Sequence, residues 1–113
     1  MLNQFSRTEL LLGKEAMERL SRARVAVFGI GGVGGYTVEA LVRSGVGAID
    51  LIDDDKVCLT NLNRQIIATR STVGKYKVEV MRDRILDINP DCKVEVHKCF
   101  YLPETRDRSE ERR

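Results

Sequence analysis

Short apolar runs occur at three points along the chain and predict the strands of a buried sheet. The runs at 24–29 (RVAVFG) and 48–53 (AIDLID) are rich in Val, Ile and Leu, which is typical of buried parallel strands. Apolar and polar residues alternate at 93–98 (KVEVHK), which also indicates a strand.

Helical spacing fills the stretches between these runs. Val38, Leu41 and Val42 share one helical face, and Gly45 follows as a natural stop. A second helical pattern spans 74–90, where Asn89-Pro90 ends it. Its apolar face consists of Val78, Met81, Ile85 and Ile88. The order β-α-β-α-β predicts one half of a Rossmann-like α/β fold with a doubly wound, mainly parallel sheet.

Short N-terminal helices are expected before the first strand. Ser6 and Glu9 have the spacing of a capping box, in which Ser6 caps a helix and Glu9 reaches back to its amide. Gly13 interrupts the helical pattern, so two short helices are expected. We therefore expect a helical segment at 1–23, a nucleotide-binding half-domain at 24–102, and a charged tail without fixed structure at 103–113.

Composition narrows the function classes. The chain has 113 residues, 19 basic and 17 acidic, with a net charge of +2, which argues neither for nucleic acid nor for a membrane surface. No apolar run approaches the roughly 18 residues that span a bilayer, and the first residues lack a signal-peptide pattern, so a cytoplasmic protein is expected. The three cysteines form no C-x-x-C pair, so the sequence predicts no metal site built on them.

The glycine-rich turn after the first run predicts a nucleotide site. Gly29, Gly31 and Gly34 fit G-x-G-x-x-G between a strand and a helix, where free amides and the helix dipole favour phosphate. Asp53 ends the second strand, where a carboxylate commonly receives ribose hydroxyls. No Walker lysine follows the glycines. These features leave NAD and ATP both open.

The stretch at 60–66 (TNLNRQI) favours a triphosphate. Arg64 can fork onto phosphate oxygens, Asn61 and Gln65 can hold ribose or phosphate, and Lys77 can reach the α-phosphate. The alternative for each residue alone is a solvated surface side chain. For Asp55, the alternatives are a direct role in metal binding or loop ordering, and simple solvation.

Taken together, the motifs GIGGVG, D-x-D, N-x-x-R-Q and V-G-x-x-K resemble the ubiquitin-activating-enzyme-like adenylyltransferases. Within that family, VCLTN and INPDC look most like the branch that dehydrates threonylcarbamoyladenosine in tRNA. The resemblance implies that ATP with Mg²⁺ binds at the glycine turn and that a substrate carboxylate is adenylated. Intramolecular attack then forms a cyclic ester and releases AMP.

Site residues follow from the resemblance by position. It implies that Asp53 takes the ribose and that Asn61, Arg64 and Lys77 hold the triphosphate. Asp55 and Gln65 are also expected in the nucleotide site, and Arg64, Lys77 and Arg7 are expected to be catalytic. Gly29, Gly31, Gly32 and Gly34 would line the phosphates. Arg7 matches an arginine that members insert into the neighbouring subunit's site, which implies a homodimer.

The resemblance also implies that part of the family's site, including the metal ligand, lies outside this chain. Members of the family continue into an aspartate that holds the metal, so the Mg²⁺ ligand is expected beyond this chain and no metal ligand is assigned within it. We expect a truncated product with weak or absent catalysis on its own. The alternatives are an adenylyltransferase for a ubiquitin-like sulfur carrier and a non-catalytic nucleotide-binding or dimerising fragment. Asn61, Arg64 and Lys77 disfavour an NAD-binding domain.

Overall fold

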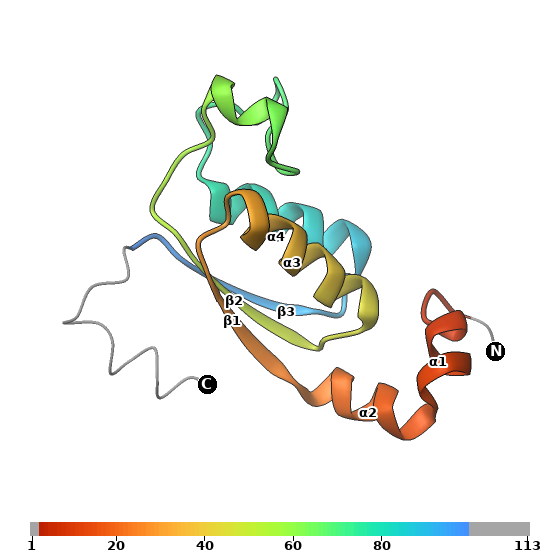
Figure 1. Ribbon diagram of the computed structural model, residues 1–113. Coiled ribbons are helices and arrows are strands. Elements are labelled where there is room, and N and C mark those ends of the chain that lie inside the picture. Colours follow the sequence, from red (N-terminus) through yellow and green to blue (C-terminus); the bar gives the residue numbers. More distant parts are fainter. Residues whose placement is uncertain (1–2, 100–113) are drawn as a thin grey trace.

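Three parallel strands form the central sheet of the protein, for which a computed structural model describes residues 3–99 (Figure 1). The strands are β1 (Arg24–Phe28), β2 (Ala48–Ile52) and β3 (Lys93–His97), in the order β1-β2-β3. Val25 pairs in register with Ile49, and Ile49 with Val94. The three predicted strands are confirmed, each ending one residue earlier than the apolar run.

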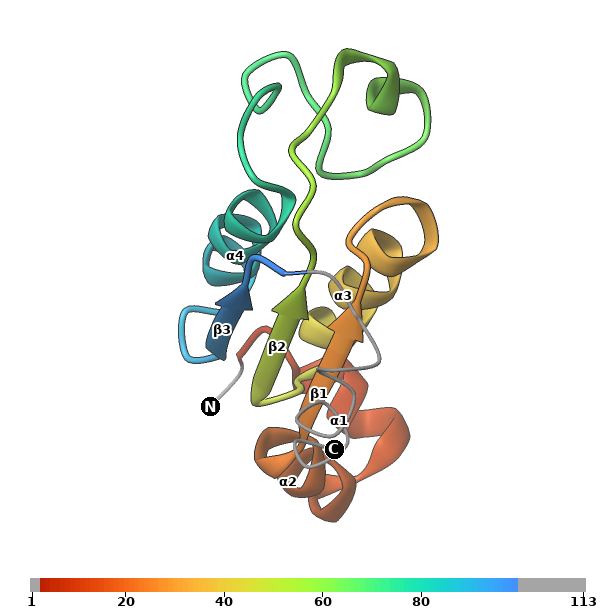
Figure 2. The same ribbon diagram turned by 90° about the vertical axis from the view of Figure 1, so that its left-hand side faces the viewer.

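Two helices pack on one face of this sheet (Figure 1, Figure 2). They are α3 (Gly32–Ser44) and α4 (Lys77–Ile88), each connecting one strand to the next. Gly45 ends α3 with a φ of 107°, a left-handed conformation that glycine adopts without strain, as the sequence predicted. The core between helices and sheet is built from the predicted apolar positions, including Val38, Val42, Ile49, Leu51, Val78, Met81 and Ile85. The Rossmann-like β-α-β-α-β arrangement is therefore confirmed.

The N-terminal helices lie at the amino-terminal end of β1 (Figure 1). They are α1 (Ser6–Leu12) and α2 (Lys14–Arg22), and Gly13 separates them with a φ of 88°. The predicted capping box is wrong, because no side chain caps α1. The chain turns earlier instead: Phe5 N–H donates to Asn3 Oδ1 at 2.8 Å, and Asn3 N–H donates to Ser6 Oγ at 2.8 Å. Ser6 is therefore the first residue of α1 and not its N-cap, so Ser6 and Glu9 cannot form a capping box.

A long polar connection between β2 and α4 projects beyond the carboxyl ends of the strands (Figure 2). It contains one short 3-10 helix, η1 (Leu59–Asn63). Helix α4 begins at Lys77, three residues later than residue 74, where the predicted helical stretch starts, because Gly74 has a φ of 89° and Tyr76 forms a bridge with Lys56. Within residues 3–99, no helix is long and apolar enough to cross a membrane. The charged tail at 103–113 lies outside the described residues, and the predicted boundaries at 23 and 102 stay predictions.

Candidate nucleotide-binding site

The glycine turn brings the end of β1 close to the start of α3. Gly29 has a φ of 85°, and its N–H donates to Ile52 O at 2.8 Å, which ties the turn to β2. A Cβ on Gly34 would lie 1.8 Å from Gly29 O, so only glycine allows the helix this approach. Gly29 and Gly34 thus meet the steric requirements that the motif predicted.

Asp53 fixes the turn from the end of β2. Its Oδ2 accepts the Ile30 N–H at 2.7 Å, and its Oδ1 accepts the Asp55 N–H at 2.9 Å. Asp55 O in turn accepts the Lys77 N–H at 3.0 Å. The Asp53 carboxylate and one backbone hydrogen bond therefore link the glycine turn, the strand end and the first residue of α4. Asp55 contributes to loop ordering through its backbone.

Gly31 forms the floor of a small polar cradle. A Cβ there would lie 3.1 Å from Gln65 Nε2 and 3.7 Å from Lys77 Nζ. The missing side chain therefore lets an amide and an ammonium, from two distant parts of the sequence, approach the backbone of the turn. We call Gly31, Asp55, Gln65 and Lys77 the edge site, because they meet at the carboxyl edge of the sheet.

Two polar groups of the edge site are buried without adequate partners. Gln65 is 8% exposed, and its Oε1 has no hydrogen-bond partner among the described residues. Lys77 is 6% exposed, and its Nζ lies 3.9 Å from Asp55 Oδ2, beyond hydrogen-bonding distance. Burying such groups without partners costs about 1–3 kcal/mol each. An anion with hydrogen-bonding oxygens and hydroxyls, such as a nucleotide, fits this arrangement.

Asn61 and Arg64 lie in the connecting loop and are not drawn into the edge site. Asn61 is buried and accepts the Cys58 N–H on its Oδ1 at 2.8 Å, which orders η1. Arg64 is exposed, and its Nη1 donates to Thr60 O at 3.2 Å. The structure therefore brings together Asp53, Asp55, Gln65, Lys77 and the glycines, and leaves the Arg64 guanidinium on the loop surface.

Arg7 lies far from the glycine turn of its own chain. It is exposed on α1, at the amino-terminal end of the strands, whereas the glycine turn is at their carboxyl end (Figure 1). Arg7 therefore does not contribute to the edge site within one chain. Its predicted role in a neighbouring subunit stays a prediction.

Acidic side chains crowd the end of β2. The carboxylates of Asp53, Asp54 and Asp55 place ligand atoms within 4.8 Å of one another. Desolvation, and then the charge of Asp55, raise the pKa of Asp54 above its ordinary value. Asp53 accepts two backbone N–H groups, so its carboxylate orders this loop.

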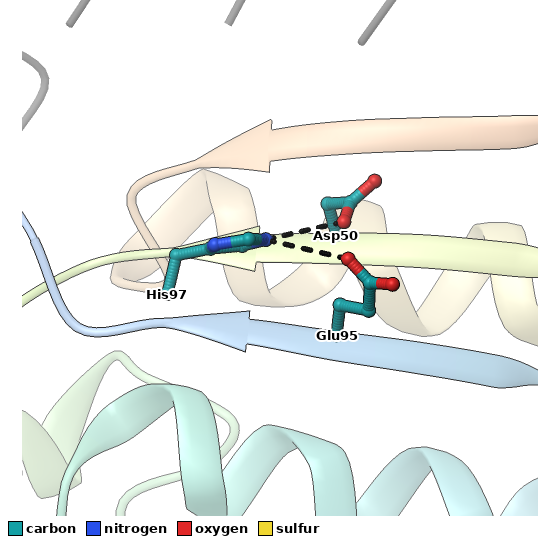
Figure 3. A group of neighbouring side chains, drawn as sticks. All are labelled: Asp50, Glu95 and His97. Carbon is teal, nitrogen blue, oxygen red and sulfur yellow. Dashed lines mark hydrogen bonds and ion pairs between the residues drawn. The ribbon is translucent and has the colours of Figure 1, made fainter. Parts of the chain in front are cut away.

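A second polar group, missed by the sequence reasoning, lies on the sheet face opposite α3 and α4 (Figure 3). Asp50 is 0% exposed and accepts Arg24 Nε at 2.7 Å and Arg24 Nη2 at 2.9 Å. His97 Nε2 lies 3.2 Å from Asp50 Oδ1 and 3.9 Å from Glu95 Oε2. The bond from Arg24 lowers the pKa of Asp50 to about 2. We call Arg24, Asp50, Glu95 and His97 the face network.

The face network is an ion-pair arrangement, even though three of its members have metal-ligating atoms. Arg24 occupies both oxygens of Asp50 and also lies 2.9 Å from Glu95 Oε2. A cation would have to displace that guanidinium. The signal in the sequence was a single acid in the middle of an apolar strand.

The fold and the edge site define a Rossmann-like α/β unit with a glycine turn at the carboxyl edge of the sheet and no Walker lysine. Residues 5–108 match the model of the ThiF family, and the chain belongs to that family. This finding confirms the family resemblance that the motifs indicated.

Individual relatives refine the comparison. The tRNA threonylcarbamoyladenosine dehydratase of Bacillus subtilis (strain 168) is 57% identical over 105 residues, which are 93% of this chain and 41% of that protein. The enzyme of the same name from Escherichia coli (strain K12) is 50% identical over 101 residues, 89% of this chain and 38% of that protein. The crystal structure of E. coli TcdA in complex with ATP matches with a TM-score of 0.94 at 47% identity, covering 96% of this chain and 44% of that one. The chain thus spans about two fifths of the length of these curated relatives.

Proposed function

We propose that this chain is the ATP-binding part of a tRNA threonylcarbamoyladenosine dehydratase. The observation that carries the proposal is the edge site. There, Gln65 Oε1 is buried with no hydrogen-bond partner among residues 3–99, and Lys77 Nζ lies beside Gly31, 3.9 Å from Asp55 Oδ2. The similarity to two dehydratases, at 57% and 50% identity, supports the choice of reaction.

In this proposal, the residues of the chain hold and polarise the nucleotide. The amides of the glycine turn and the N-terminus of α3 receive phosphate oxygens, with Gly31 and Gly32 at the closest approach. Lys77 places an ammonium where negative charge grows during reaction, and Arg64 supplies a second cation from the loop. Asp53 is positioned at the strand end for the ribose hydroxyls.

When bound, ATP would supply a phosphorus atom that the substrate carboxylate can attack with loss of pyrophosphate. The activated carboxylate then has a good leaving group, and a nucleophile within the same substrate group displaces AMP. The chain's task is positioning, because the attacking atom is already held close by the substrate itself. We expect Mg²⁺ to accompany the triphosphate.

The same proposal includes a homodimer. Arg7 is exposed at the end of the molecule opposite its own glycine turn, so it can serve such a turn only in another copy. We also propose that the protein acts in the cytoplasm, because its proposed substrate is a tRNA.

Nucleotide binding is the first test. Titration calorimetry with ATP should show at least about a tenfold loss of affinity for Lys77→Ala and for Arg64→Ala, since each removes a charge-assisted contact. Lys93→Ala is the matched control, because Lys93 is exposed at the opposite end of the sheet. Unchanged affinity in both site variants would overturn the phosphate assignment.

Pyrophosphate exchange tests the substrate. Exchange that depends on tRNA carrying threonylcarbamoyladenosine supports the proposal. Exchange that depends on a carrier protein ending in Gly-Gly would instead support an adenylyltransferase. ATP binding without exchange in either case would identify a non-catalytic nucleotide-binding chain.

A further inference from the structure

Two lysines flank the ring of Tyr76 at the carboxyl edge of the sheet. Lys98 Nζ lies 4.5 Å and Lys56 Nζ lies 5.1 Å from the ring centroid, both within cation–π distance. An isolated antiparallel bridge between Lys56 and Tyr76 fixes the two residues beside each other. Lys98 follows directly after β3, so three separate parts of the chain converge on one aromatic ring.

The segment of the sequence that carries Tyr76 is rich in basic residues, between the acidic residues at 53–55 and Glu79. Residues 56–78 contain five basic residues and no acidic one, although the whole chain has a net charge of only +2. Two of the five, Arg64 and Lys77, are already assigned to the nucleotide. Lys56 and Lys75, which precedes Tyr76, are exposed. The balanced composition of the chain therefore conceals a strongly basic segment, which the sequence reasoning missed.

The position of these lysines suits a large anionic substrate. They lie at the same edge of the sheet as the glycine turn, but next to β2 and β3 instead of β1. Neighbouring strands are about 4.8 Å apart, so this group is roughly 10 Å from the turn. The connection that contains Lys56 and Lys75 projects beyond the strands (Figure 2). If one nucleotide of a nucleic acid entered the edge site, the backbone next to that nucleotide would pass over these lysines.

We propose that Lys56 and Lys98, which flank the Tyr76 ring, and the exposed Lys75, which precedes it in the sequence, form a contact site for the phosphate backbone of the tRNA substrate. We call this group the lysine patch. The inference rests on the proposed function and adds a location for the RNA that is separate from the ATP site. The Tyr76 ring orients the ammonium groups of Lys56 and Lys98 without neutralising their charge.

The acidic residue Glu79 leads to a second prediction for RNA binding, with an effect opposite to that of the lysines. Its carboxylate contacts the Lys98 ammonium, and this contact lowers the pKa of Glu79. RNA phosphates must therefore compete with Glu79 for Lys98. Removing the acid should strengthen RNA binding, whereas removing the lysines should weaken it.

The test measures binding of a tRNA carrying threonylcarbamoyladenosine by fluorescence anisotropy at several salt concentrations. In the double variant Lys56→Gln/Lys75→Gln, we expect about a tenfold loss of affinity at low salt. The slope of log Kd against log salt should fall by about 1 for each lysine removed. Glu79→Gln should bind the tRNA more tightly than the wild type.

The matched control is Lys14→Gln/Lys93→Gln, which removes the same charge from two exposed lysines away from the carboxyl edge. Its tRNA affinity and slope should equal those of the wild type. ATP affinity, measured on the same samples, should be unchanged in the patch variants.

The outcomes separate the two proposals. If the patch variant and the control lose affinity equally, or if neither loses any, the lysine patch is overturned while the proposed function stands. Wild-type protein that binds ATP but no tRNA would overturn both the patch and the tRNA substrate. Loss of ATP binding in the proposed Lys77 and Arg64 variants is judged independently of either result.

Discussion

The molecule has two groups of buried polar side chains, one on a face of the sheet and one at its carboxyl edge. They differ in how fully their side chains are hydrogen-bonded. In the face network, Asp50 is fully buried, and Arg24 donates to both of its oxygens. Figure 3 shows the further contact of Asp50 with His97. In the edge site, Gln65 Oε1 has no partner among the described residues, and Lys77 Nζ is 3.9 Å from its only carboxylate. A paired group contributes to stability, whereas an unpaired one is a candidate contact for a ligand.

Position along the strands produces this difference. Asp50 lies in the middle of β2, in register with Ala26 on β1 and Glu95 on β3, so residues of the neighbouring strands lie beside it. The edge site lies where the strands have ended, and its side chains come from loops and from the start of α4. Parallel strands place such ends at one edge, where ligands commonly bind.

The largest effect is expected at Gly34, where the turn of the edge site is made. Gly34→Ala places a Cβ 1.8 Å from Gly29 O, which no rotation of a side chain can relieve. We expect the free energy of unfolding to fall by at least about 3 kcal/mol and ATP binding to be lost. Urea unfolding followed by circular dichroism measures the first quantity, and calorimetry the second.

Gly32→Ala is the control for this prediction. A Cβ at Gly32 has nothing within 4 Å, and the residue begins α3. Its free energy of unfolding should stay within about 0.5 kcal/mol of the wild type. A comparable loss in both variants would show that the close approach at Gly34 is not what the turn requires.

A smaller loss, of stability alone, is expected in the face network. Asp50→Asn removes the charge that Arg24 binds, and we expect the free energy of unfolding to fall by about 2 kcal/mol at pH 7. ATP affinity should be unchanged, because Asp50 lies on the sheet face and not at its carboxyl edge. Asp91→Asn, at an exposed position, serves as the control. A drop in ATP affinity would remove the distinction between the two groups.

Low pH should abolish the stabilisation of the folded protein that the Asp50 carboxylate provides. Its pKa is about 2 in the folded protein against 3.8 ordinarily, so its stabilisation is complete above pH 3.8 and is lost as the pH falls towards 2. We expect the stability difference between wild type and Asp50→Asn to shrink from about 2 kcal/mol at pH 6 to near zero at pH 2. Urea titrations at four pH values measure it. A difference independent of pH would assign the loss to packing.

The sequence predicted the strands and helices well because their apolar residues have clear spacing. All three strands begin at the predicted residues, and Gly45 ends α3 as expected. The errors lie at helix starts. The chain turns at Asn3 instead of Ser6, and Tyr76 pairs with Lys56 before α4 can begin. Both depend on contacts that no local pattern records.

The site was predictable to the extent that it depends on local motifs. Glycine spacing located the turn, and the motif residues Gln65 and Lys77 do approach Gly31. The face network was not predictable, because it requires knowing that β2 lies between β1 and β3. The orphaned Gln65 Oε1 was equally hidden, since hydrogen bonding is a property of the fold and not of a motif.

The smallest change in the free energy of unfolding is expected at Gln65. It gives the sharpest contrast, because its sign is opposite to that of the change at Asp50. Gln65→Leu roughly keeps the side-chain volume and removes the buried oxygen for which residues 3–99 offer no hydrogen-bond partner. We expect the free energy of unfolding to rise by about 1 kcal/mol, since the desolvation cost of that oxygen disappears. ATP affinity should fall by about tenfold, since the amide can no longer contact the ligand.

Gln4→Leu, at an exposed position, should change neither the free energy of unfolding nor the ATP affinity. A loss of stability in Gln65→Leu would place Gln65 with Asp50 among the side chains that hold the fold together, and the edge site would lose its main distinguishing feature.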